Sequence, residues 1–143
     1  MKIKELMIKN IVTVPSNLQV HKAVKLMNRN KIGCLVVVDG SQTTGILTKR
    51  DILEKVVEKR KDPQKAKISE IMTENVIVGI PDMELADAAN LMFEKKVKKL
   101  PVVDDGQLVG LVTLTDIARV TSVNRETAQL LEKLSRMNLT KFL

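Results

Sequence analysis

An internal repeat is the feature that most constrains the fold of this 143-residue chain. When the sequence is aligned with itself at an offset of 65 residues, Gly45–Ile52 falls on Gly110–Ile117 and Leu35–Asp39 falls on Leu100–Asp104. A fixed period of this length is typical of a chain built from two copies of one supersecondary unit. We therefore expect two similar halves, each with the same elements.

Each half predicts a mixed α+β order of elements, β-α-β-β-α. A short β segment ends at Pro15 or Pro81, where the register of the two copies slips by one residue and indicates an insertion in a loop. Apolar residues at helical spacing predict the next element, a helix. These positions are Val20, Ala23, Val24 and Met27 in the first copy, and Leu85, Ala88, Ala89 and Met92 in the second.

A buried strand, a hairpin turn, a return strand and a second helix complete each copy. The buried strands are the β-branched runs within Leu35–Val38 and Leu100–Val103. The second helices begin near Arg50 and Thr115. Two such halves are expected to pack about a pseudo-twofold axis, which would bring corresponding loops together into two related clefts.

The repeat also sets the expected domain boundaries. The first copy spans residues 1–60 and the second spans residues 68–122, joined by a charged, exposed linker at 61–67. Residues 123–143 predict an amphipathic C-terminal helix. Its apolar stripe consists of Leu130, Leu131, Leu134 and Met137.

The composition excludes several classes of protein. The single cysteine, Cys34, cannot form an intramolecular disulfide, and with the single histidine, His21, it cannot supply the ligands of a structural zinc site. Cys34 is interpreted as a small buried apolar residue and His21 as a surface residue, so no catalytic or metal-binding constellation is found and we expect no enzyme. The sequence has neither the apolar core of a signal peptide nor a membrane span, which indicates a soluble, cytoplasmic protein.

A hydroxyl and a carboxylate three residues apart occur at the same place in both copies. Thr48 precedes Asp51, and Thr113 precedes Asp116, each where a strand gives way to a helix. The N–H groups at a helix start attract phosphate, and a carboxylate there accepts hydrogen bonds from a vicinal diol such as a ribose. Arg50 offers a bidentate contact to phosphate oxygens.

The same residues also have a purely structural interpretation. Thr or Asp at a helix start is more often an N-cap than a ligand group, and a cap would be duplicated with the repeat. Lysines 95, 96, 98 and 99 are equally open to two interpretations, because a run of charge at a helix end is usually a solvated face.

These motifs together resemble a tandem pair of CBS domains, the cystathionine β-synthase-type regulatory or Bateman module. The resemblance covers residues 1–122 and rests on three features: the Met-containing opening of each copy, the strand Leu100–Asp104, and Gly-aliphatic-aliphatic-Thr-x-x-Asp occurring twice. It implies the β-α-β-β-α fold and the binding of AMP, ADP, ATP or S-adenosylmethionine, as regulatory ligands and not catalytic cofactors. Nearly all of the chain is accounted for by the pair, so the resemblance implies a stand-alone module that acts on an effector protein in trans.

The resemblance also implies two nucleotide sites, whose residues are carried over by their position in the repeat. One site has Asp116 on the ribose hydroxyls, Thr113, Thr115 and Lys98 near phosphate, and Val12 and Ile32 of the other copy against the adenine. The other has Asp51, Thr48 and Arg50, with Ile77 and Val97 around the base and Gly33 in place of the lysine.

Two other functions remain open from the residues. The net charge of +7, from 24 Lys and Arg against 17 Asp and Glu, is compatible with a nucleic-acid-associated scaffold, although two Phe and no Trp or Tyr leave little for base stacking. The third hypothesis is a ligand-free dimerisation module. The apolar C-terminal stripe and the flat faces of CBS pairs favour a homodimer in any of these cases.

Overall fold

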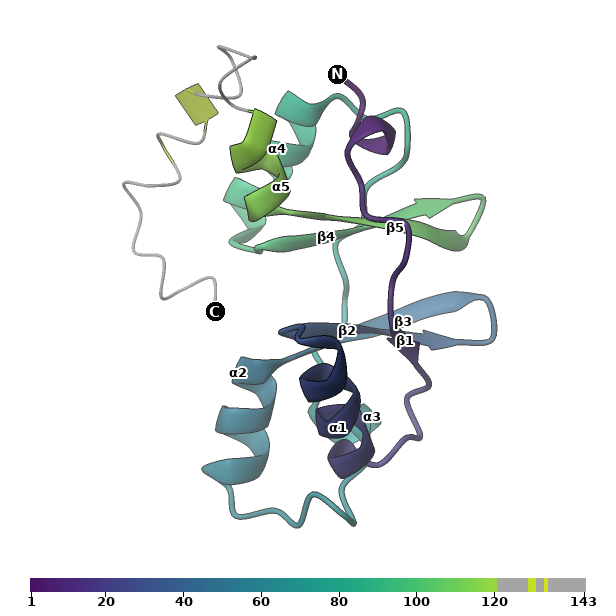
Figure 1. The fold of residues 1–143 in the computed structure, drawn as a ribbon, viewed down its shortest axis with the longest axis vertical. Coiled ribbons are helices and arrows are strands. Elements are labelled where there is room, and N and C mark those ends of the chain that lie inside the picture. Colours follow the sequence, from purple (N-terminus) through teal and green to yellow (C-terminus); the bar gives the residue numbers. More distant parts are fainter. Residues whose placement is uncertain (121–128, 131–132, 134–143) are drawn as a thin grey trace. The chain divides into compact units, whose positions relative to one another are not determined.

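The computed structural model describes residues 1–120, 129–130 and 133, which form two compact units (Figure 1). The central unit is Ile11–Val76, and the terminal unit combines Met1–Asn10 with the chain from Ile77 onward. Both units contain a sheet and helices, so the predicted α+β class is confirmed. In chain order the elements are η1 (Ile3–Glu5), β1 (Thr13–Val14), α1 (Val20–Asn30), β2 (Cys34–Asp39), β3 (Gln42–Thr48), α2 (Lys49–Ile52), η2 (Leu53–Val57), α3 (Ile68–Ile71), α4 (Leu85–Lys95), β4 (Lys99–Asp104), β5 (Gln107–Thr113) and α5 (Leu114–Val120).

The central unit is built on a three-stranded sheet of order β1-β2-β3. β1 runs parallel to β2, and β2 and β3 form an antiparallel hairpin. Thr73 continues the sheet by an antiparallel bridge to Ile46 at the free edge of β3. Helix α1 and the helix formed by α2 and the π-helical turn η2 cover one face of this sheet (Figure 1).

The terminal unit repeats this plan with β4 and β5. Gly79 pairs in parallel with Val102 on one side of the hairpin, and Ile8 pairs antiparallel with Leu111 on the other. Each of these four residues lies 65 positions from its counterpart in the central unit. Helices α4 and α5 pack on one face of the hairpin (Figure 1).

The opening segment of each sequence repeat packs in the unit formed by the other repeat. Ile3 is fully buried among the core residues of the terminal unit, whereas its counterpart Ile68 is fully buried in the central unit. Met7 lies over Gly110, and Met72 lies over Gly45, so closely that a Cβ at either glycine would collide with the thioether. Each of these contacts therefore packs a methionine from the opening segment of one repeat against a glycine in the return strand of the other repeat.

Ion pairs hold the N-terminal segment to the start of α4. The Lys2 ammonium lies 2.8 Å from a Glu84 oxygen, and the Lys4 ammonium lies 2.8 Å from Asp82. Hydrogen bonding to these carboxylates raises the pKa of both lysines and lowers the pKa of Glu84 and of Asp82. All four side chains are solvent-accessible, so these pairs position the segment, and burial of Ile3 supplies most of its attachment.

The predicted single-residue insertion near the prolines is wrong. Val14 and Gly79 pair with residues at the same repeat position, and α1 and α4 both begin at equivalent residues, so the offset of 65 holds throughout. The residue equivalent to Ser16 is Pro81, and this is a difference in residue type. The Ser16 N–H donates to the Asp39 carboxylate at 2.9 Å and lowers the pKa of Asp39, whereas a proline has no N–H to donate.

Each unit has its own hydrophobic core. The central core consists of Val14, Val20, Ala23, Met27, Leu35, Val37, Leu47, Val56, Ala66, Ile68 and Ile71. The terminal core consists of Ile3, Leu85, Ala88, Ala89, Met92, Leu100, Val102, Val112 and Ile117. All eight residues predicted from helical spacing belong to these cores or pack against them, and Cys34 is buried as expected.

The predicted linker at 61–67 is exposed over most of its length. Residues 58–65 are exposed, whereas Ala66 in the predicted linker is buried and its carbonyl accepts from the N–H of Val20 at the start of α1. The predicted helix at 123–143 lies outside the described residues apart from Gln129, Leu130 and Lys133, of which Leu130 packs against the terminal core. Within the part of the chain that the structure describes, no helix is long and apolar enough to cross a membrane.

Candidate functional site

In the central unit, the predicted Thr–Asp pair forms a closed turn between β3 and α2. The Thr48 backbone N–H donates to Asp51 Oδ2 at 2.9 Å, and the Asp51 N–H donates to Thr48 Oγ1 at 3.2 Å. The Thr48 hydroxyl also donates to Asp51 Oδ2 at 3.1 Å. These bonds form because a helix start leaves N–H groups without partners, and a threonine and an acid three residues apart satisfy them reciprocally.

The terminal unit forms the same turn between β5 and α5. The backbone N–H and the hydroxyl of Thr113 both donate to Asp116 Oδ2 at 2.9 Å, and the Asp116 N–H returns a bond to Thr113 Oγ1 at 3.2 Å. Asp116 and Asp51 are the two buried charged residues among those described, 6% and 5% exposed. The capping interpretation is thus confirmed for both turns. In each turn the cap occupies Oδ2 of the carboxylate, and the two turns differ in the partners of Oδ1.

The partners of Oδ1 distinguish the two turns. Asp51 Oδ1 accepts from Lys55 Nζ at 3.0 Å and from the Thr73 hydroxyl at 3.1 Å. Among the residues that the structure describes, Asp116 Oδ1 has only Arg119 Nη1 nearby, at 3.8 Å, and that side chain is 75% exposed. The contacts to Asp51 were not predicted. The repeat does contain a signal for them, since Lys55 and Thr73 align with Val120 and Ile8, which have no side-chain donor.

The predicted phosphate-binding groups lie beside these turns with different availability. The Arg50 guanidinium is on the exposed face of α2 and pairs with Glu54 at 2.6 Å, so an anion would compete with that carboxylate. Thr115 is exposed at the start of α5, and Lys98 is half-buried immediately before β4. The Lys98 carbonyl accepts from the N–H of Leu114, which fixes this residue next to the Thr113 turn.

The position of Gly33, where the lysine is missing, is covered by another lysine. The Gly33 carbonyl accepts from the Lys49 N–H, as the Lys98 carbonyl does from Leu114. The Lys49 side chain runs along Gly33, with Cε 3.6 Å from where a Cβ would stand. The side chain of Lys49, the first residue of α2, thus brings a lysine to the position of Gly33, which the sequence pattern alone did not predict.

The four apolar residues predicted to contact adenine are half-buried and divided between the units. Val12 and Ile32 pack against the central core, and Ile77 and Val97 pack against the terminal core. Their place beside a ligand stays a prediction.

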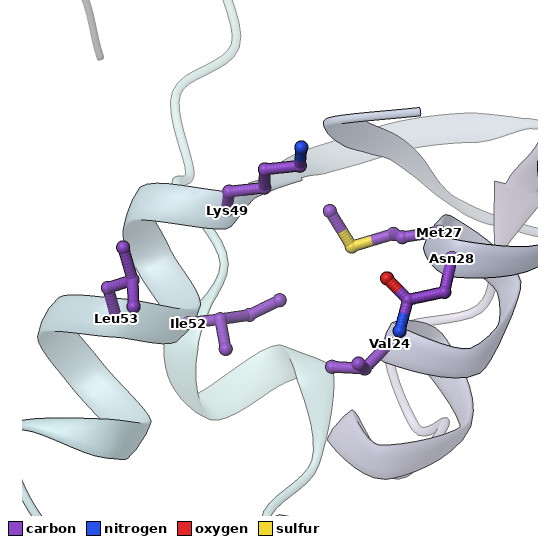
Figure 2. Close-up of a pocket in the computed structure, with 6 residues that line it drawn as sticks. All are labelled: Val24, Met27, Asn28, Lys49, Ile52 and Leu53. Atoms are coloured by element: carbon purple, nitrogen blue, oxygen red, sulfur yellow. The ribbon is translucent and has the colours of Figure 1, made fainter. Parts of the chain in front are cut away.

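A pocket of about 240 Å³ lies between α1 and α2 of the central unit (Figure 2). It is lined by Val24, Met27, Asn28, Lys49, Ile52 and Leu53. The lining is largely aliphatic and includes no carboxylate to receive a diol. The pocket therefore does not coincide with the Thr48–Asp51 turn, although Lys49 borders both.

Comparison with known proteins identifies the family of this arrangement. The model of the CBS domain matches residues 3–58 and again residues 68–122. The CBS domain-containing protein YhcV of Bacillus subtilis is 33% identical over 137 residues, which cover 96% of this chain and 97% of that protein. The chain spans a smaller share of several other curated relatives, for example 23% of one and 63% of another from Methanocaldococcus jannaschii.

Solved structures show the same fold. A conserved CBS domain protein of unknown function, TA0289 from Thermoplasma acidophilum, matches with a TM-score of 0.80 and 32% identity, covering 95% of this chain and 77% of that chain. The CBS domain pair of protein MJ0100, solved in complex with 5′-methylthioadenosine and S-adenosyl-L-methionine, matches with a TM-score of 0.76 and 32% identity over 85% of this chain and 96% of that chain.

Proposed function

Because the chain belongs to the CBS-domain family and contains two CBS domains in tandem, we propose that it is a regulatory module that binds an adenosine-containing ligand and transmits binding to a partner protein. The observation that carries this proposal is the duplicated Thr–Asp turn, which presents a carboxylate beside a helix start in each unit. The solved CBS pair that holds 5′-methylthioadenosine and S-adenosylmethionine supports the ligand class.

The chemistry of the turns fits an adenosine ligand at two points, the ribose diol and the charged group. A carboxylate accepts both hydroxyls of a ribose diol, and its remaining oxygen stays bonded to the threonine. Lys98 beside the Asp116 turn and Lys49 beside the Asp51 turn supply positive charge for a phosphate or for a carboxylate of the ligand. AMP, ADP, ATP and S-adenosylmethionine all satisfy this description, and the proposal covers all four.

The regulatory part of the proposal follows from linkage. A ligand that contacts two conformations of the chain unequally shifts the population toward the better-bound one and changes the surface offered to another protein. We place the effector in trans, on another protein, and assign the chain a regulatory rather than a catalytic role.

The test is calorimetric titration of refolded, ligand-stripped protein with AMP, ADP, ATP and S-adenosylmethionine. The chain has no Trp or Tyr, so adenine carried over from expression is visible in the ultraviolet spectrum before the titration. Saturable binding of at least one ligand is the expected result. Absence of heat with all four, together with retention on DNA that falls steeply with salt, would transfer the assignment to the nucleic-acid scaffold.

We also propose that the module is a homodimer. Leu53, which lines the pocket of Figure 2, and Val57, four residues further along η2, are 61% and 63% exposed, and aliphatic side chains this exposed favour contact with another surface. Sedimentation velocity at micromolar concentration should give a dimer, and Leu53→Glu should shift it toward monomer. A monomeric wild-type protein would refute this assignment.

A further inference from the structure

We infer that the two Thr–Asp turns are not equivalent: the Asp116 turn accepts the diol of a ligand, whereas the Asp51 turn is closed by Lys55 and Thr73 of the same unit. This inference rests on the proposed function, because it specifies which of the two turns the adenosine ligand occupies. It uses only contacts inside each unit.

The acceptor capacity of Asp51 is already filled. An ionised carboxylate offers about four lone-pair positions. Oδ2 of Asp51 receives the backbone N–H and the hydroxyl of Thr48, and Oδ1 receives Lys55 Nζ at 3.0 Å and the Thr73 hydroxyl at 3.1 Å. A ribose diol would have to displace the last two donors before it bonded to this carboxylate.

Displacement of Lys55 has a further consequence. Its ammonium bonds at once to Asp51 and to the Ile71 carbonyl, each at 3.0 Å, and so ties α2 and η2 to the end of α3. The Lys55 side chain is 41% exposed, so its charge is partly solvated, but the Asp51 side chain that it contacts is only 8% exposed. A neutral hydroxyl is a weaker donor to a buried carboxylate than an ammonium is, which makes the exchange unfavourable.

Asp116 retains the capacity that Asp51 lacks. Its Oδ2 receives the two Thr113 donors, but no donor among the described residues lies within hydrogen-bond distance of Oδ1. Arg119, at 3.8 Å and on an exposed side chain, is free to turn toward a ligand phosphate or toward solvent. A diol therefore gains hydrogen bonds at Asp116 Oδ1 without breaking a hydrogen bond from any of the described residues.

The difference arises from two positions of the repeat. Where the central unit has Lys55 and Thr73, the terminal unit has Val120 and Ile8, neither of which has a side-chain donor. The backbone at these positions is otherwise equivalent, since Ile8 bridges to Leu111 as Thr73 bridges to Ile46. Exchange of these residue pairs should therefore exchange the properties of the turns.

The experiment is a calorimetric titration of the wild-type chain and four variants with AMP, ADP, ATP and S-adenosylmethionine. The wild-type chain should bind one ligand per chain, Asp116→Asn should abolish binding, and Asp51→Asn should leave it within about threefold. The opening variant, Lys55→Met with Thr73→Val, should gain a second site. The closing variant, Val120→Lys with Ile8→Thr, should weaken binding at least tenfold.

Circular dichroism melting of each variant distinguishes a lost site from a lost fold, and the opening variant, which gains binding, is informative even if the closing variant does not fold. Two equal sites in the wild type, one of them removed by Asp51→Asn, would overturn this inference and leave the proposed function intact. Absence of binding to the wild type and to the opening variant would overturn both.

Discussion

Replacement of Ile3 by alanine should weaken the terminal unit, although Ile3 belongs to the first sequence repeat. The side chain is completely buried, its Cδ1 lies against Gly79, and it shares a core with Leu85 and Leu100. Ile3→Ala removes three carbon atoms, which is worth roughly 2.4 kcal/mol of transfer free energy at about 0.8 kcal/mol each, and the residual cavity raises the loss to about 3 kcal/mol. That loss is a large part of the stability of a small domain.

Hydrogen exchange followed by mass spectrometry measures where the loss falls. A local loss of about 3 kcal/mol lowers protection by about 150-fold, since each 1.4 kcal/mol is tenfold. The fall should appear in peptides from α4, β4 and β5 and not in those from α1 and β2. Ile68→Ala, at the equivalent position of the repeat, is the matched control and should show the reverse pattern. A fall in protection confined to α1 and β2 in the Ile3 variant, or shared equally by both units, would refute the conclusion that each opening segment packs in the unit formed by the other repeat.

Three further outcomes are expected from particular contacts. Asp39→Asn should destabilise the protein at neutral pH and Asp104→Asn should not, because only Asp39 has the Ser16 N–H and the Thr44 hydroxyl as donors. Hydrogen bonds from Ser16 and Thr44 lower the pKa of Asp39 in the folded state, so its contribution to stability is present above the pKa of the unfolded chain and is lost as the pH falls through the folded pKa. Urea titrations from pH 7 downward should therefore show a difference between wild type and Asp39→Asn that shrinks as the solution becomes acidic. Lys96→Gly should raise the melting temperature, since Lys96 ends α4 at φ 55°, where glycine is unstrained and a Cβ costs about 1 kcal/mol; an unchanged or lower value would contradict this. Gly45→Ala should cost about 1–3 kcal/mol in urea unfolding, because its Cβ would lie 2.6 Å from Met72 Sδ and 3.0 Å from the Thr73 carbonyl oxygen; a neutral result would show that both can move aside.

The elements of this fold were predictable from sequence because each has a local signal. The helical spacing at Val20–Met27 and Leu85–Met92 and the β-branched runs of β2 and β4 correctly predicted α1, α4 and the two hairpins. The packing of each opening segment in the unit of the other repeat has no such signal. Alignment of the two repeats does not reveal whether Met7 packs on Gly45 or on Gly110. Only the tertiary pairing of Ile8 with Leu111 decides that.

Only part of the candidate site was predictable from the sequence. The Thr–Asp spacing indicated both turns, because a capping box depends on residues three apart. The closure of Asp51 depends on Thr73, which is 22 residues away in sequence, and the charge beside Gly33 comes from the conformation of a long lysine side chain. The first is a tertiary contact, which the repeat signals only through the difference between Thr73 and its counterpart Ile8, and the second is a choice among rotamers, which has no signal in the sequence.

The exchanged opening segments also constrain the order in which this protein can fold during synthesis. Ile3 cannot reach its partners until the ribosome has made Met83 and Leu100, because its backbone N–H donates to the Met83 carbonyl and its side chain packs beside Leu100. All residues of the central unit, Ile11–Val76, have been made before Ile77, so this unit can form first. The N-terminal segment Met1–Asn10 is unpaired until the rest of the terminal unit has been made. Closing a loop of about 80 residues is a slow step with a high contact order. A circular permutant that begins at Ile77 and joins the original termini would shorten that loop. Its refolding should be faster if packing of the segment Met1–Asn10 into the terminal unit limits the rate.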